Sequence, residues 1–193
     1  MHEIALFVED FAHRQVIGAL VQRIAGDFNL DVQLDWRNAT RGYGQVVREF
    51  NAYLRAIERQ GHPSPDMIIV ATDANCKGRN QRIRDFGDPV SPAPIVHAIP
   101  DPHIERWLLL DGAAFKAVFG RGCDAPDQKC DRYRYKQRLV HAIFDTGITP
   151  NLGGMEFAED IVQQMDIERA ELADDSFGRF VGSLRATLRG WWR

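Results

Sequence analysis

The sequence predicts an α/β fold, in which a mainly parallel four-stranded sheet is flanked by helices and followed by a helical C-terminal part. Four short apolar runs are bounded by polar residues, as in strands buried on both faces of a parallel sheet. Segments with apolar residues at helical spacing lie between these runs, which is typical of right-handed βαβ units. After residue 129 the pattern is helical throughout.

In the first part of the chain the expected elements follow one another closely. Residues 3–8 are strand-like, and residues 12–24 carry apolar side chains at helical spacing. Apolar and polar residues alternate over 32–36, as in a half-buried strand. A glycine-containing loop at 38–44 then leads into a helix at 46–57.

The third strand, at residues 67–72, is the most apolar and is expected at the centre of the sheet, followed by a short basic helix. A fourth strand at 95–99 is bracketed by prolines. Pro102 suits the first turn of a helix and Asp101 suits its N-cap, so a helix is expected to start there. A loop is expected at 120–129. Further helices are expected around 139–144, at 155–165 and at 177–188.

The composition predicts one compact domain. The chain has 193 residues, of which 45% are hydrophobic, and we expect an α/β core at 1–111 with a helical extension at 112–193 packed on it. No stretch approaches the roughly 18 apolar residues of a membrane span, and the N-terminus does not have the pattern of a signal peptide. A cytoplasmic protein with no membrane partner is therefore expected.

The three cysteines form a sparse, odd-numbered set, which argues against a secreted disulfide framework. Reduced thiols are therefore expected. Cys123 and Cys130 lack a second close pair, so a zinc site would need His97, His103 or His141 from far away in sequence. No role is assigned to Cys76, Cys123 or Cys130 at this point.

Acidic side chains occur where strands end or a helix begins. Glu9 and Asp10 end the first strand, Asp73 and Asn75 follow the third, and Glu105 lies near the start of a helix. Ligands of parallel sheets bind beyond the carboxyl ends of the strands, and magnesium takes oxygen ligands. These positions therefore predict divalent-metal chemistry, for which phosphodiester cleavage or a related phosphoryl transfer is the fitting reaction. Helix capping is the structural alternative for the same side chains.

Basic residues cluster locally although the formal net charge is -3. Lys77, Arg79 and Arg82 follow the strand that Asp73 ends, and Arg41 flanks a glycine loop. One interpretation is a solvated surface. The other is that these residues bind the phosphates of a nucleic acid near the acidic positions.

Other chemistries have no motif in the chain. The sequence contains neither a Walker-type phosphate loop nor a dinucleotide glycine fingerprint. None of its serines lies in the context of a nucleophile elbow.

The acidic positions together resemble the Toprim superfamily, the metal-binding phosphotransfer domain of topoisomerases, bacterial primases and OLD-family nucleases. The family pattern is a glutamate after the first strand and Asp-x-Asp after the third. Residues 7–10 (Phe-Val-Glu-Asp) match the first part. Residues 71–75 (Ala-Thr-Asp-Ala-Asn) match the second, with Asn75 in place of the last aspartate.

A narrower similarity is to small stand-alone Toprim-like proteins related to RloB and OLD-associated proteins, many of which accompany restriction and anti-phage systems. Such proteins carry a Glu-x-Trp helix after a proline-rich strand end, as in Glu105-Arg106-Trp107. They also tend to end with a Ser-Phe-x-x-Phe helix, which residues 176–180 resemble. The similarity extends over nearly the whole chain.

This resemblance implies a Rossmann-like Toprim fold that binds Mg²⁺ or Mn²⁺. It assigns catalytic or metal-binding roles to Glu9, Asp73 and Glu105, and a weaker or water-mediated ligand role to Asn75. A neutral Asn75 in place of aspartate should weaken a metal site that depends on charge. Trp107 is expected in the core. Acidic candidates of second rank are Asp10 and Asp111.

The chain is too short for a topoisomerase or a primase, which need further domains. The leading hypothesis is therefore a Mg²⁺- or Mn²⁺-dependent nuclease in a phage-defence or toxin-like system, acting on DNA or RNA. The alternative is a catalytically weak or inactive Toprim-like module that binds nucleic acid or a partner ATPase. The ATPase would be a separate protein, because this chain has no ATP-binding motif. A homodimer is compatible with either hypothesis.

Overall fold

The computed structural model describes residues 1–38, 42–60, 63–131 and 133–191. Its centre is a sheet of four parallel strands in the order β2-β1-β3-β4. The strands are β1 (His2–Val8), β2 (Val32–Asn38), β3 (Met67–Ala71) and β4 (Ile95–Ala98). The predicted α/β class, the four strands and the central place of the third strand are confirmed, and the sheet is parallel throughout.

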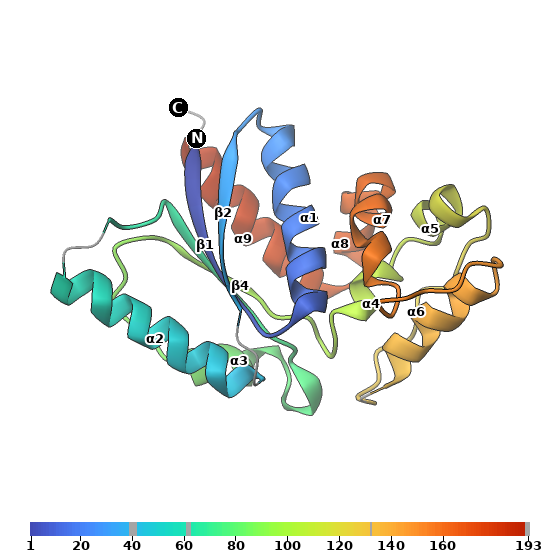
Figure 1. Cartoon of the computed structure of the whole chain (residues 1–193), viewed down its shortest axis with the longest axis horizontal. Coiled ribbons are helices and arrows are strands. Elements are labelled where there is room, and N and C mark those ends of the chain that lie inside the picture. Colours follow the sequence, from blue (N-terminus) through green and yellow to red (C-terminus); the bar gives the residue numbers. More distant parts are fainter. Residues whose placement is uncertain (39–41, 61–62, 132, 192–193) are drawn as a thin grey trace.

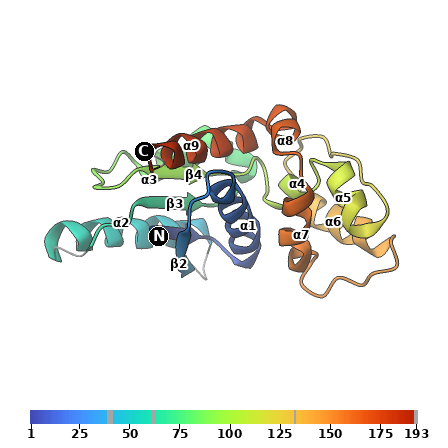
Figure 2. The same cartoon turned by 90° about the horizontal axis from the view of Figure 1, so that it is seen from above.

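Helices cover both faces of this sheet, as Figures 1 and 2 show. On one face, α1 (Phe11–Asp27) and α9 (Asp175–Trp191) pack against alternate side chains such as Ile4 and Leu6. On the other face, α2 (Tyr43–Gln60) and α3 (Arg79–Phe86) pack against the intervening ones such as Phe7. This two-sided burial explains why residues 4–8 of β1 and all of β3 are continuously apolar.

The remaining helices lie beyond the end of the sheet to which the strands point (Figure 2). They surround the carboxyl ends of the strands, where the acidic residues lie. These elements are α4 (Glu105–Leu108), α5 (Gly112–Phe119), α6 (Arg134–Phe144), the 3-10 helix η2 (Met155–Phe157), α7 (Ala158–Gln164) and α8 (Ile167–Ala173).

Trp107 joins the parts of the chain before and after residue 111. It is fully buried, and its ring packs against Phe177 and Phe180 at centroid distances of 5.2 and 5.6 Å. Its Nε1 donates a hydrogen bond to Ser176 Oγ at 3.1 Å. The predicted core position of Trp107 is confirmed, and the Ser-Phe-x-x-Phe segment is the surface against which it packs.

Several sequence-based boundaries are wrong. The helix expected from Pro102 begins at Glu105, and the Asp101 carboxylate accepts a hydrogen bond from the backbone N–H of Arg79. The helix expected at 155–165 is divided into η2 and α7. The sequence did not predict α5 or α8, because helices of eight and seven residues carry too few turns for a clear period.

A close backbone approach leads to the first prediction. Gly112 opens α5, and a Cβ at this position would lie 2.2 Å from the carbonyl oxygen of Cys123. Gly112→Ala should therefore lower the free energy of unfolding by about 1–3 kcal/mol, the usual cost of overpacking. The melting temperature should fall by roughly 2–4 °C for each kcal/mol.

The matched control is Gly26→Ala, in the last turn of α1, where an added Cβ meets no heavy atom within 4 Å. This substitution should leave the melting temperature unchanged or raise it, since alanine is favoured over glycine in a helix. Equal melting temperatures for the two variants would contradict the close approach at Gly112.

Candidate functional site

The site lies where the order of the strands reverses. The chain passes from β1 to β2 on one side and then returns to place β3 on the other side of β1. Ligands of open parallel sheets bind in the crevice at such a reversal, beyond the carboxyl ends of the strands. Glu9 directly follows β1 and Asp73 lies two residues after β3. The backbone N–H of Asp73 donates to Glu9 Oε2 at 3.3 Å, so these two predicted site residues are in contact.

Asp73 is held from several directions. Its Oδ2 is 2.9 Å from His103 Nδ1, and its Oδ1 accepts a hydrogen bond from the backbone N–H of Ile104 at 2.8 Å. His13 Nε2 lies 3.2 Å from Oδ1. Burial favours the neutral acid, but the charge of His13 and the hydrogen bond to His103 outweigh it and lower the pKa of Asp73. Asp73 is therefore a largely buried carboxylate, with 17% of its side chain exposed, held between two imidazoles.

His13 connects Asp73 to α1, the first helix. The ring is completely buried, and its Nδ1 lies 2.8 Å from Asp10 Oδ1. The same Asp10 oxygen accepts from the backbone N–H of His13, which makes Asp10 the N-cap of α1. Burial lowers the pKa of His13, but the charge of Asp73 and the hydrogen bond to Asp10 raise it well above its ordinary value. The second-rank candidate Asp10 thus caps a helix and orients His13.

His103 is the second residue that the predicted site did not include. Burial disfavours its charged form, yet the hydrogen bond to Asp73 and the Asp73 charge raise its pKa above the ordinary value. Its buried Nε2 has no hydrogen-bond partner among the described residues. A helical Asp10-x-x-His13 spacing was the one sequence signal for either histidine, because both contact Asp73 across a long stretch of chain.

Glu9 and Glu105 differ from Asp73 in their ionisation. Each is half-buried, and burial together with the negative charge of Asp73 raises the pKa of both carboxyls. Three carboxyls thus share this end of the sheet, and the pKa of Asp73 is shifted in the opposite direction from the pKa values of Glu9 and Glu105. A positive ion near Glu9 and Glu105 would lower the pKa values of both carboxyls.

Asn75 lies on a turn that the neighbouring loop fixes. Its backbone N–H donates to the carbonyl of Pro102 at 3.0 Å, and its φ of 51° is in the left-handed region that asparagine tolerates. The side-chain Nδ2 donates to the carbonyl of Asp73 at 3.3 Å. The amide is therefore engaged with the backbone, and its role as a metal ligand stays a prediction.

The fit to a divalent cation is limited to a small set of ligands. Within residues 1–38, 42–60, 63–131 and 133–191, no three His, Cys, Asp or Glu side chains are grouped as a metal site. The Asp73 oxygens are already engaged by His103, Ile104 and His13. Glu9 and Glu105 provide two further carboxylates of the kind that magnesium uses together with waters and substrate phosphates.

Asp111 has a structural role at another place in the fold. It is buried, caps α5 through the backbone N–H groups of Ala113 and Ala114, and contacts Arg169 Nη2 through both oxygens at 2.7 and 2.8 Å. These contacts join α5 to α8. Nothing in them connects Asp111 to the site around Asp73.

The basic residues predicted to bind nucleic acid divide into different environments. Lys77 is exposed and Arg79 is half-buried, next to the site. The expected role of Arg82 in phosphate binding is corrected, because the residue is only 3% exposed. Its Nε donates to the carbonyl of Asp73 at 3.0 Å, and its guanidinium lies 3.7 Å from the Tyr43 ring centroid. A phosphate backbone cannot reach Arg82 in this conformation. Arg41 lies outside the described residues.

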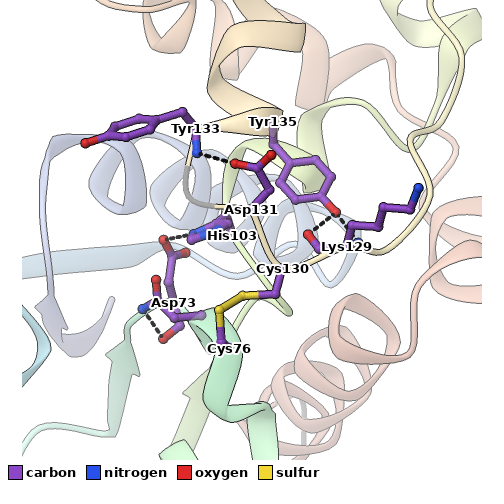
Figure 3. The surroundings of a disulfide bond; sticks show 9 residues. Asp73, Cys76, His103, Lys129, Cys130, Asp131, Tyr133 and Tyr135 are labelled. Atoms are coloured by element: carbon purple, nitrogen blue, oxygen red, sulfur yellow. Dashed lines mark hydrogen bonds and ion pairs between the residues drawn. A yellow bond between two sulfur atoms is a disulfide. The ribbon is translucent and has the colours of Figure 1, made fainter.

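The expectation of three reduced thiols is also corrected. Cys76 and Cys130 form a disulfide with a Cα–Cα distance of 5.3 Å, and Figure 3 shows it close to Asp73 and His103. Cys76 belongs to the 3-10 helix η1 (Asn75–Lys77), which directly follows Asp73. The bond ties this turn to the 120–131 loop, whose end is also held by the Tyr135 hydroxyl. Cys123 is free, and burial raises the pKa of its thiol to about 11.

Comparisons with protein-family models, with curated proteins and with solved structures found no match for this chain. The Toprim resemblance therefore stays a prediction that rests on the motifs. Among the described residues, no helix is long and apolar enough to cross a membrane.

The two histidines predict how stability depends on pH. The pKa values of His13 and His103 are raised in the folded protein, so their stabilising contribution is complete below the unfolded value of about 6.5. It is lost as the pH rises through the folded pKa values. The free energy of unfolding, measured with urea between pH 6 and 9, should fall in the wild type. His13→Gln should show a smaller fall.

His141→Gln, at an exposed position of α6, is the matched control and should keep the wild-type dependence. The same fall in His13→Gln as in the wild type would show that the buried imidazole does not carry the charge described here.

The disulfide predicts a difference between oxidised and reduced protein. It closes a loop with a sequence separation of 54 residues. Cys130→Ser should lower the free energy of unfolding in non-reducing buffer by about 2–4 kcal/mol, mainly because the unfolded chain gains freedom. Urea unfolding measures this loss. Reductant should bring the wild type to the value of the variant, whereas Cys123→Ser should keep the response to reductant. A wild type insensitive to reductant would contradict the bond.

Proposed function

We propose that the protein is a Mg²⁺- or Mn²⁺-dependent nuclease that hydrolyses phosphodiester bonds. The observation that best supports this function is the position of Glu9 and Glu105. Both carboxyls lie near the charge of Asp73 at the reversal of a parallel sheet, and both have raised pKa values. Perturbed carboxyls at such a crevice are typical of catalytic and metal sites.

In this proposal Glu9 and Glu105 hold the cation, and waters and a substrate phosphate complete its shell. When bound, the ion supplies polarisation of a phosphoryl oxygen and acidification of a water. Asp73 does not need to be a direct ligand. Held by His103 and the Ile104 N–H, it orders the loop from which Glu105 projects, and its backbone N–H orients Glu9.

Proton transfer is assigned to Glu9. Glu9 takes this role when Glu105 and waters hold the cation, because a directly bound cation would lower the Glu9 pKa that burial and Asp73 raise. The residue is half-buried and follows the end of β1, so its backbone is fixed by the sheet. Lys77 and Arg79, on the segment after Asp73, are assigned to the phosphates of the bound strand.

The experiment is cleavage of labelled single- and double-stranded DNA and RNA in Mg²⁺, in Mn²⁺ and in EDTA. Wild-type protein should cleave at least one substrate only with metal. Glu9→Gln and Glu105→Gln should each lose about 10²-fold or more in rate, the usual contribution of a positioned acid or base. These variants keep the size of the side chain, whereas Asp73→Ala would remove the carboxylate that faces Nε2 of the buried His13.

Glu58→Gln, on the exposed surface of α2, is the matched control and should cleave as the wild type does. Full activity of Glu9→Gln would refute the proposed role of this residue. The folded state of every variant is checked by its melting temperature.

A second candidate function is supported by the contacts of the Asp73 carboxylate with other groups of the protein. Because its oxygens are occupied by protein groups and the amide of Asn75 faces the backbone, the chain also fits a module without catalytic activity. Such a module would bind nucleic acid, or a partner ATPase, with no turnover in any metal. Its binding of nucleic acid should weaken steeply with salt. Multiple-turnover cleavage would exclude it.

A further inference from the structure

A hollow lies along the same end of the sheet, next to the segment that follows Asp73. It is formed by the segment after β3, by the loop after β4 and by the start of α9, and its volume is about 350 Å³. Figure 1 shows α3 and α9 on opposite faces of the sheet, so the hollow is built from both helical layers. Its charged lining residues are Lys77, Arg79, Arg84, Arg179, Asp101 and Asp175.

The positive side chains of this hollow exceed the negative ones. Four basic residues line it against two acidic residues. The Asp175 carboxylate accepts from Arg179 Nε at 2.7 Å, and the Asp101 carboxylate accepts from the backbone N–H of Arg79 at 3.4 Å. One carboxylate is thus paired with a guanidinium and the other with a main-chain group, which leaves a net positive surface.

Arg79 has a buried nitrogen without a hydrogen-bond partner among the described residues. The residue is half-buried, and this nitrogen is its Nε. Burial lowers the pKa of the Arg79 guanidinium, and the positive charge of Arg179 lowers it further. Two guanidinium groups from distant parts of the chain therefore repel each other at one hollow. An anion bound between them would offset both the repulsion and the cost of burying the Arg79 charge.

We propose that this hollow binds a phosphate group of a nucleic-acid strand, through the guanidinium groups of Arg79 and Arg179. Guanidinium groups present paired N–H donors that match phosphate oxygens, and Lys77 adds a further donor at the rim. Arg179 lies in the last helix, and no sequence pattern associates it with Arg79. The proposal rests on the proposed nuclease function, since it assigns a phosphate neighbouring the cleaved bond to this hollow.

The position of the hollow favours a nucleic-acid strand that runs along the end of the sheet. Lys77 and Arg79 follow Asp73 by four and six residues, and Asp101 lies in the loop after β4 that also carries His103. One chain segment therefore connects the carboxylate site with the hollow. A polyanionic strand would meet Glu9 and Glu105 at one crevice and the two arginines at the next.

The test is fluorescence anisotropy of a labelled 12-nucleotide single strand in EDTA, with the Glu9→Gln protein as a non-cleaving background. Replacing both arginines, Arg79→Gln with Arg179→Gln, should weaken binding at least tenfold. The slope of log K against log salt concentration should become less negative by about 0.7 for each phosphate that the protein no longer neutralises. Arg79→Lys should give a smaller loss, because it keeps the charge and removes the paired donors.

The matched control removes two exposed arginines elsewhere, Arg55→Gln with Arg189→Gln, in the same background. It should change binding less than threefold. Equal losses of binding affinity in the two double variants would overturn the proposal, because they would mean that every surface arginine contributes equally to binding of the strand. Melting temperatures with and without inorganic phosphate give a second readout: phosphate should raise that of Glu9→Gln but not that of its Arg79 and Arg179 double variant.

The outcomes for the hollow and for the nuclease are separable. A wild type that cleaves no substrate in any metal, with a tenfold loss for the arginine pair, would refute the nuclease and support the phosphate site. A wild type that cleaves, with no loss for the arginine pair beyond the control, would refute the phosphate site and support the nuclease.

Discussion

The arrangement at the end of the sheet depends on one largely buried charge, the carboxylate of Asp73. A carboxylate removed from water is strongly destabilising unless it is paired and hydrogen-bonded. Here His103, His13 and the Ile104 N–H supply those partners from two other segments. The start of α1 and the loop after β4 must therefore keep their positions around β3, because displacement of either would leave a buried charge without its partner.

That constraint determines where the other polar groups lie. The loop after β4 cannot move from Asp73, and its carbonyls at Pro100 and Pro102 accept from the backbone N–H groups of Ala74 and Asn75. Glu105 begins α4 directly after this loop. Its carboxyl is therefore held close enough to Asp73 for the negative charge of Asp73 to raise the pKa of Glu105. The disulfide adds a covalent connection from η1 to the 120–131 loop. Backbone pairing, ion pairing and a covalent bond thus converge on the few residues that follow β3.

The sequence predicted the parts of this arrangement that follow from local pattern. Alternation of apolar runs located the strands, and the rule that parallel strands end at one edge brought Glu9 close to Asp73. The rule could not reveal that His13 and His103 hold Asp73, since these contacts span 60 and 30 residues and no period encodes them. Arg82 was misassigned for the same reason: a basic run in sequence carries no information about which member turns inward to Tyr43 and the Asp73 carbonyl.

The three carboxyls show how one end of a sheet can shift the pKa values of its acids in opposite directions. Asp73 has its pKa lowered because donors and positive rings surround it, whereas Glu9 and Glu105 have theirs raised because they meet burial and the charge of Asp73 with few donors. Pairs of acids whose pKa values are separated in this way divide the tasks of a hydrolytic site, one carboxyl staying charged and another exchanging a proton. The same field that raises the pKa values of the two glutamates also attracts a cation. A purely structural ion-pair network would need only Asp73 and its two histidines. Glu9 and Glu105 are not needed for such a network, and they are therefore the residues whose presence favours a catalytic or metal-binding role over a structural one.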